Sequence, residues 1–136
     1  MAEAYGSRRT FYSAEGSSLC IKAMLGIVCR SGQGKKITVA APRNVHKAFI
    51  NACILLDIDV EWIYPKGEFT SICAGSVTPE EVEKVLAETE VDCVYVTSPD
   101  YLGDLSDIKG MRRGLQKIRC TSSLRQRSRS LSEVSP

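Results

Sequence analysis

The sequence is poor in the residues that usually mark a metal site, an aromatic core or a membrane segment. It contains one histidine and one tryptophan, and aromatic residues make up 7% of the chain. No run approaches the roughly 20 apolar residues that a membrane-spanning helix needs. Residues 1–10 lack the apolar stretch of a secretory signal. We therefore expect a cytoplasmic protein that has no membrane partner.

The cysteines show no pattern of a metal or disulfide framework. None of the six forms a C-x-x-C pair, and a single histidine cannot complete a zinc site, so we expect no bound metal. Several lie in apolar segments, where a cysteine packs as a small hydrophobic residue. We expect reduced, structural thiols at all six positions: Cys20, Cys29, Cys53, Cys73, Cys93 and Cys120.

Charge and composition divide the chain into two parts. The 136 residues carry a net charge of +2, and 43% are hydrophobic, which is ordinary for a globular domain. Residues 1–111 hold 11 basic and 15 acidic side chains, whereas residues 112–136 hold 7 basic and one acidic. We expect 1–111 to be a folded domain. We expect 112–136 to be a basic, Ser/Arg-rich tail that is disordered or translated out of frame, and we expect no nucleic-acid partner.

Helical and strand patterns alternate through residues 17–111. Residues 17–31 are apolar on nearly all sides, which predicts a buried helix that Ser17 or Ser18 caps and that Gly32 and Gly34 end. Apolar spacing predicts a helix over 45–56, Thr78-Pro79-Glu80-Glu81 predicts a capped helix start, and another helix is expected to begin over 104–111. Short β-branched runs predict strands at 37–41, 60–64 and 91–96.

This alternation predicts an α/β fold, a three-layer α/β/α sandwich with a mostly parallel sheet. Ligands of such sheets gather at the carboxyl ends of the strands. Three loops are expected at that edge: residues 13–18, 43–47 and 97–103.

Each loop has a functional and a structural interpretation. Gly16, Ser17 and Ser18 open a helix and suit a phosphate, although helix capping explains the same residues. His46 could stack on a flat ring or transfer a proton, or it could be a surface residue at a helix start. The hydroxyls of Thr97 and Ser98 suit ligand contact, whereas the adjoining Pro99 and Gly103 suit an ordinary turn.

Taken together, the loops resemble the major domain of the bacterial ornithine/lysine/arginine decarboxylase family. The resemblance covers residues 2–111. It rests on Thr10-Phe11-Tyr12-Ser13 with Gly16-Ser17-Ser18, on Arg43-Asn44-Val45-His46-Lys47, on Val60-Glu61-Trp62-Ile63-Tyr64-Pro65, and on Tyr95-Val96-Thr97-Ser98-Pro99-Asp100-Tyr101-Leu102-Gly103.

The resemblance implies the aspartate-aminotransferase-like fold, present here in part, and pyridoxal phosphate as cofactor. It implies that Gly16, Ser17 and Ser18 hold the cofactor's phosphate, that His46 stacks on its ring, and that Thr97 and Ser98 lie beside it. It also implies a basic amino acid as substrate and a homo-oligomeric full-length parent.

Two motifs of the family are absent from the sequence. The family attaches its cofactor to the lysine of a Ser-x-His-Lys motif and holds the ring nitrogen with the aspartate of an Asp-x-Ala-His motif, and neither occurs here. We therefore assign no catalytic residue and expect a fragment that is inactive alone. Two alternatives stay open: a non-catalytic module that binds a decarboxylase subunit, and a small phosphate- or nucleotide-binding α/β protein.

Overall fold

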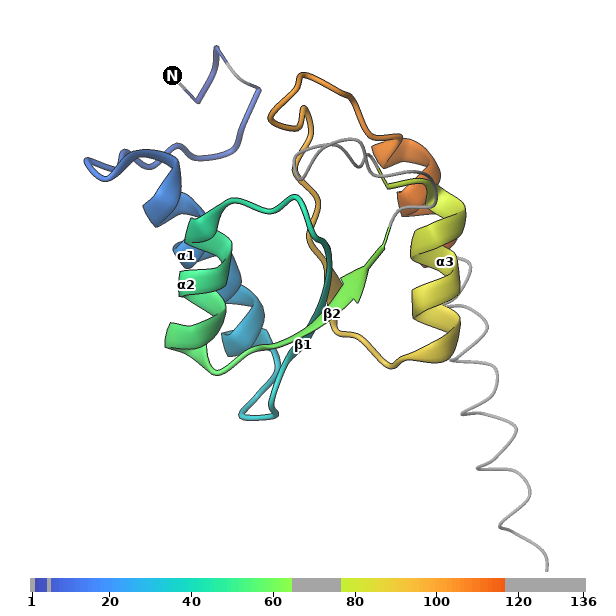
Figure 1. Ribbon diagram of the computed structural model, residues 1–136. Helices are drawn as coiled ribbons and strands as arrows, with labels where there is room; N and C mark the ends of the chain where they lie inside the picture. The colour runs from blue at the N-terminus through green and yellow to red at the C-terminus, as the bar shows by residue number, and fades with distance from the viewer. Residues whose placement is uncertain (1, 5, 65–76, 117–136) are drawn as a thin grey trace, which may run out of the picture.

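The computed structural model describes residues 2–4, 6–64 and 77–116 of the chain. Three strands form one parallel sheet in the order β2-β1-β3, with helices on both faces (Figure 1). The elements are α1 (Gly16–Ser31), β1 (Thr38–Pro42), α2 (Lys47–Leu56), β2 (Asp59–Ile63), α3 (Pro79–Glu88) and β3 (Cys93–Val94).

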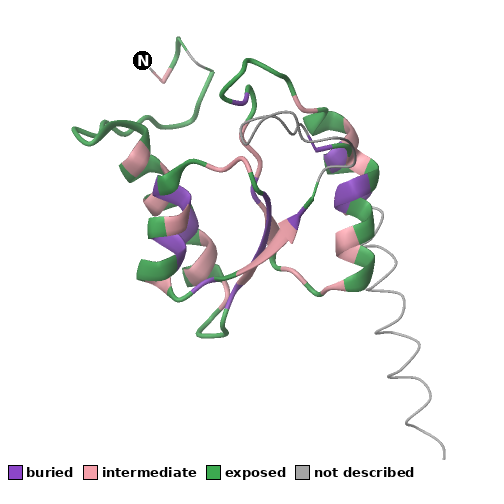
Figure 2. Ribbon diagram, in the orientation of Figure 1, coloured by how far each residue is buried: buried purple, intermediate pink, exposed green. Residues whose placement is uncertain are grey.

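The central strand β1 separates two apolar clusters, because successive side chains of a strand point to opposite faces. Val39 and Ala41 pack with Leu25 of α1 and Phe49 of α2 in one cluster. Ala40 packs on the other face, in the cluster of Ile63, Val77, Val82 and Met111. The sheet therefore lies between two helical layers, and its central strand β1 is the mostly buried one (Figure 2). The predicted three-layer α/β/α sandwich is confirmed.

Helix α1 differs from its prediction in two respects. Only Leu25 of this helix is buried, while Met24 is 48% and Ile27 is 68% exposed, so the expectation of a buried helix is wrong. The helix begins at Gly16 with Glu15 at the N-cap and no side-chain cap, so neither Ser17 nor Ser18 caps it. Its end at Gly32 is as predicted.

Helix α3 begins as its local sequence predicts. The Thr78 hydroxyl accepts a hydrogen bond from the Glu81 N–H at 3.4 Å, and the Glu81 carboxylate accepts from the Thr78 N–H at 2.9 Å. This reciprocal capping box satisfies two N–H groups that the first turn would otherwise leave unpaired. Pro79 occupies the first helical position, where its missing N–H costs nothing.

The last described segment is helical over residues 108–116. It begins later than the predicted 104 and crosses the expected boundary at residue 111, where Met111 is 4% exposed. The strand expected over 91–96 is shorter and pairs only at Cys93 and Val94. Residues 65–76 and 117–136 lie outside the described residues, so the expected state of the tail stays a prediction.

Candidate functional site

The three predicted loops lie at the same end of the molecule. Residues 13–18 lead into α1, residues 43–46 connect β1 to α2, and residues 95–107 follow β3. Figure 1 shows all three segments at the end where the strands finish. The parallel strand order brings them there, because parallel strands place all their carboxyl ends at one edge.

The start of α1 offers backbone donors that no side chain caps. Gly16 has φ +62°, a left-handed conformation that glycine adopts without strain, and a methyl group added there would meet nothing within 4 Å. Ser17 is exposed and Ser18 is half-buried in the following turn. An accessible helix N-terminus with nearby hydroxyls favours a negatively charged ligand, because its N–H groups and the helix dipole point toward it.

His46 is exposed and forms the N-cap of α2. Its Nδ1 accepts a hydrogen bond from the Ala48 N–H at 3.1 Å, which fixes the ring against the first turn of the helix. On the buried side of α2, the ring of Phe49 packs against that of Tyr95, with 4.4 Å between the ring centroids. The histidine is therefore held by the helix start on one side, and its ring remains open to solvent.

The loop after β3 is organised by Asp100, which is 9% exposed. Its Oδ1 accepts hydrogen bonds from the N–H groups of Leu102 and Asp104, both at 2.9 Å. The Ser98 hydroxyl accepts from the Ser106 N–H at 3.1 Å. Ser98 is thus partly committed to the loop itself, whereas the half-buried Thr97 precedes this turn.

Three buried side-chain oxygen atoms have no hydrogen-bond partner within the described part of the chain: Asn44 Oδ1, Thr97 Oγ1 and Asp100 Oδ2. All three residues follow β1 or β3 at the carboxyl edge. A buried oxygen without a partner costs roughly 1–3 kcal/mol. Thr97 was predicted as a site residue, and the structure adds Asn44 and Asp100. Their position in the loops that follow β1 and β3 was the sequence signal, but their burial depends on tertiary packing.

Arg43 directly precedes Asn44 in the sequence, and its guanidinium lies over two aromatic rings. Its Cζ is 5.7 Å from the Trp62 ring centroid and 5.8 Å from that of Tyr64. The contact orients an exposed positive charge at the edge where β1 and β2 finish. The carboxyl edge therefore presents one oriented cation together with the uncapped start of α1.

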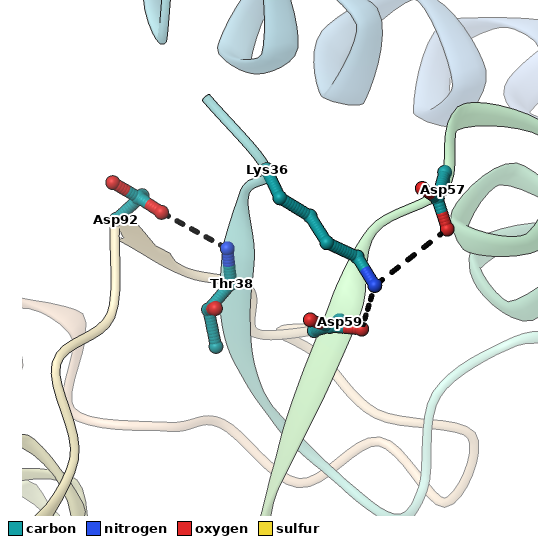
Figure 3. A network of polar contacts seen from close by, with 5 residues as sticks. All are labelled: Lys36, Thr38, Asp57, Asp59 and Asp92. Carbon is teal, nitrogen blue, oxygen red and sulfur yellow. Dashed lines mark hydrogen bonds and ion pairs between the residues drawn. The ribbon is translucent and has the colours of Figure 1, made fainter. Parts of the chain in front are cut away.

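The amino ends of the strands form a separate polar network, shown in Figure 3. Lys36 Nζ lies 2.8 Å from Asp59 Oδ1 and 3.7 Å from Asp57 Oδ1. The hydrogen bond to Asp59 and the charges of both aspartates raise the pKa of Lys36 above its ordinary value. Asp92 Oδ2 accepts a hydrogen bond from the Thr38 N–H at 2.9 Å. This network links β1, β2 and the segment before β3.

Of the thiols at the sheet, Cys53 is buried and Cys93 is half-buried. Burial raises the pKa of the Cys53 thiol, and it raises the pKa of Cys93 to about 11. A thiol held in its neutral form is a poor nucleophile. Cys20, Cys29, Cys53 and Cys93 are all free.

The residues described outside the gaps at 1, 5, 65–76 and 117–136 contain no cluster of three or more potential metal ligands and no helix suited to crossing a membrane.

Comparison with known proteins identifies the family. A family model described as the Orn/Lys/Arg decarboxylase, major domain, matches residues 1–121. The chain belongs to the Orn/Lys/Arg decarboxylase family. The resemblance seen in the three loops is therefore confirmed, and the observed sandwich agrees with part of an aspartate-aminotransferase-like domain.

Curated relatives of this Orn/Lys/Arg decarboxylase family member are named arginine decarboxylase. The chain is 32% identical to the one from Bacillus subtilis over 111 residues, which is 81% of this chain and 22% of the relative. It is 35% identical to the one from Halalkalibacterium halodurans over 109 residues, 79% of this chain and 21% of the relative. The chain thus spans about a fifth of the length of these relatives.

Proposed function

We propose that this chain provides the phosphate- and ring-binding half of a pyridoxal-phosphate site in a decarboxylase of basic amino acids, and that it is inactive alone. The observation that carries the proposal is the position of three loops at one edge of the sheet, where the family's cofactor residues are expected. The name of the relatives makes arginine the first substrate to test. The expected cytoplasmic location belongs to the same proposal.

The donors present at this edge fit such a cofactor. The uncapped N–H groups of α1 with Ser17 and Ser18 suit a phosphate. The open ring of His46 suits a stacked heteroaromatic ring. The buried Thr97 hydroxyl and the side-chain amide oxygen of Asn44 lack partners among the described residues, so a ligand with donors and acceptors would satisfy them.

Pyridoxal phosphate supplies an electron sink for the electron pair released when carbon dioxide leaves. This chain's residues bind and orient that group, but two further roles have no residue here. The sequence lacks the lysine motif for covalent attachment and the aspartate motif for the ring nitrogen. Lys47 does not replace the lysine, because it lies in the first turn of α2 within the Arg43–Lys47 motif.

The proposal is tested with pyridoxine 5′-phosphate, which lacks the aldehyde and therefore cannot react with surface lysines. We expect saturable, reversible binding that pyridoxine without phosphate does not show. Ser18→Ala and His46→Ala should each weaken binding roughly tenfold, as expected when one ligand contact is lost. Ser31→Ala is the matched control, because its hydroxyl bonds to the Ile27 carbonyl at the opposite end of α1.

Two outcomes would contradict the proposal. Stoichiometric fixation of pyridoxal phosphate by borohydride at one lysine, with release of carbon dioxide from arginine, would show a complete site. Thermal stabilisation by a nucleotide, with no response to pyridoxine 5′-phosphate, would instead support the small nucleotide-binding alternative.

A further inference from the structure

Three cysteines converge in the apolar cluster between the sheet and the layer formed by α1 and α2. Cys53 is a buried member of this cluster, and Cys29 and Cys93 pack against it as half-buried residues. We call the three residues the thiol cluster. All three thiols are free in the structure, and none of them belongs to the carboxyl-edge loops.

Cys29 and Cys53 occupy equivalent positions on two parallel helices. α1 leads into β1 and α2 leads into β2 on the same face of the sheet, so the two helices run side by side in the same direction (Figure 1). Leu25 of α1 and Phe49 of α2 are buried in the same cluster. Each cysteine follows one of these residues by four positions, which places it one turn further along the same helix face.

Helices packed in this way bring facing Cα atoms within the range of a disulfide. The axes of packed helices are roughly 8–10 Å apart and each Cα lies about 2.3 Å from its axis, so facing Cα atoms are separated by about 3–6 Å. A disulfide spans about 4.4–6.8 Å between Cα atoms. The two thiols also interact electrostatically, because the pKa of Cys53 is raised by burial and, to a smaller extent, by Cys29.

A small cavity leads to this pair from the amino ends of the strands. It has a volume of about 230 Å³ and is bounded by the last turn of α1, the segment before β1 and the end of α2. Cys29 lines this cavity, whereas Cys53 is 5% exposed and does not. A small reagent from solution therefore reaches Cys29 first.

We propose that Cys29 and Cys53 form a reversible disulfide by exchange with a low-molecular-weight disulfide that enters through this cavity. In the first step the Cys29 thiolate attacks one sulfur of the reagent, and one reagent thiolate leaves. In the second step the Cys53 thiolate attacks Cys29 Sγ of the mixed disulfide, and the other reagent thiolate leaves. The reagent takes up the two electrons that the protein thiols lose, and the two protein protons end on the released reagent thiols.

The order of the two steps follows from burial. The attacking species is a thiolate, and burial keeps Cys53 neutral by raising its pKa, so this thiol reacts poorly with a dissolved reagent. Once Cys29 carries the reagent, attack by Cys53 is intramolecular, and proximity offsets the low thiolate fraction. Cys93, whose pKa burial raises to about 11, is the weaker competitor for this step.

The test oxidises the whole chain with glutathione disulfide, in the absence of cofactor, and maps the disulfides that form. Trypsin cleaves after lysine and arginine and places each of the six cysteines on its own peptide, so every pair gives a distinct linked mass. The peptides of Cys29 and Cys53 should be linked in at least about tenfold excess over any other pair, because their proximity favours the intramolecular step. Dithiothreitol should separate them, and in urea the excess should disappear because the helices no longer pack.

Three alanine variants separate the two steps. Cys53→Ala should retain glutathione on Cys29, because no thiol remains to attack the mixed disulfide. Cys29→Ala should leave Cys53 reduced, because the accessible thiol is missing. Cys20→Ala is the matched control, since Cys20 is exposed on the same helix and lies outside the thiol cluster, and this variant should form the linked pair as the wild type does.

Three results would overturn the proposal. A dominant link from Cys93 to either of the other two thiols would assign the bond to a different pair. Equal yields of the link between Cys29 and Cys53 in buffer and in urea would show that the fold does not select it. Glutathione that stays on Cys29 of the wild type, with no link to Cys53, would show that the two thiols do not meet.

Discussion

Polar side chains at the two ends of the sheet differ in what they contact. At the amino ends, Lys36 pairs with Asp57 and Asp59, and Asp92 accepts from the Thr38 N–H. At the carboxyl ends, three buried oxygen atoms have no partner within the described residues, namely Asn44 Oδ1, Thr97 Oγ1 and Asp100 Oδ2, and α1 starts without a side-chain cap. One end satisfies its polar groups internally and serves stability. The other end leaves these three oxygen atoms without a partner among the described residues, and they are the atoms that we propose a ligand reaches.

The largest expected loss of stability comes from removing the packing beneath the carboxyl ends of the strands. Phe49→Ala should lower the free energy of unfolding by about 3–5 kcal/mol, because the fully buried ring leaves a cavity against Tyr95. Urea denaturation measures the change. Ile54→Ala, on the same helix but 76% exposed, should change stability little. Equal losses in both variants would mean that α2 is buried on both sides in solution.

The next largest loss of stability is expected in the loop after β3. Asp100→Ala should cost about 2 kcal/mol, because the N–H groups of Leu102 and Asp104 lose their acceptor. Asp100→Asn keeps an oxygen for these donors and should cost about half as much. Chemical denaturation of the two variants is the measurement. Equal stability of the alanine variant and the wild type would show that the carboxylate does not hold the loop.

A smaller loss of stability is expected from removing Asp92, the carboxylate that accepts a backbone hydrogen bond at the amino ends of the strands. Asp92→Ala should cost about 0.5–1 kcal/mol, because its hydrogen bond to the Thr38 N–H is exposed and water can replace it. Binding of pyridoxine 5′-phosphate should be unchanged in this variant. A larger loss than in Asp100→Ala would reverse the comparison between the two ends of the sheet.

The smallest effect concerns Lys36, whose ion pairs are exposed to solvent. Lys36→Met should lower the melting temperature slightly at neutral pH and less in high salt. Because the folded-state pKa of Lys36 is raised above 10.5, its contribution is present below that pH and is lost as pH rises through the raised pKa. The difference from wild type should therefore vanish in strongly alkaline buffer. A difference that grows with pH contradicts this assignment.

The sequence predicted those features that depend on neighbouring residues. The capping box of Thr78 and Glu81 lies within four residues, and the three-layer order follows from alternating periodicities. The exposure of α1 was not predictable, because an apolar helix is buried only if another layer covers it. The length of β3 likewise depends on its neighbours, and within the described part of the chain it pairs with β1 alone.

The candidate site divides in the same way. The three loops could be placed from sequence because a parallel sheet brings the ends of its strands together. The sequence could not show that Asn44 Oδ1 and Asp100 Oδ2 are buried without a partner among the described residues. Burial of a single oxygen atom depends on side chains that are distant in the sequence. The cap at Glu15 in place of Ser17 was missed because several polar residues near Gly16 suit a helix start equally well.

The hydrogen bond that fixes His46 also selects its tautomer. Since Nδ1 accepts from the Ala48 N–H, the neutral ring carries its proton on Nε2. The exposed nitrogen is therefore a donor, and a group that approaches it in the ring plane must be an acceptor.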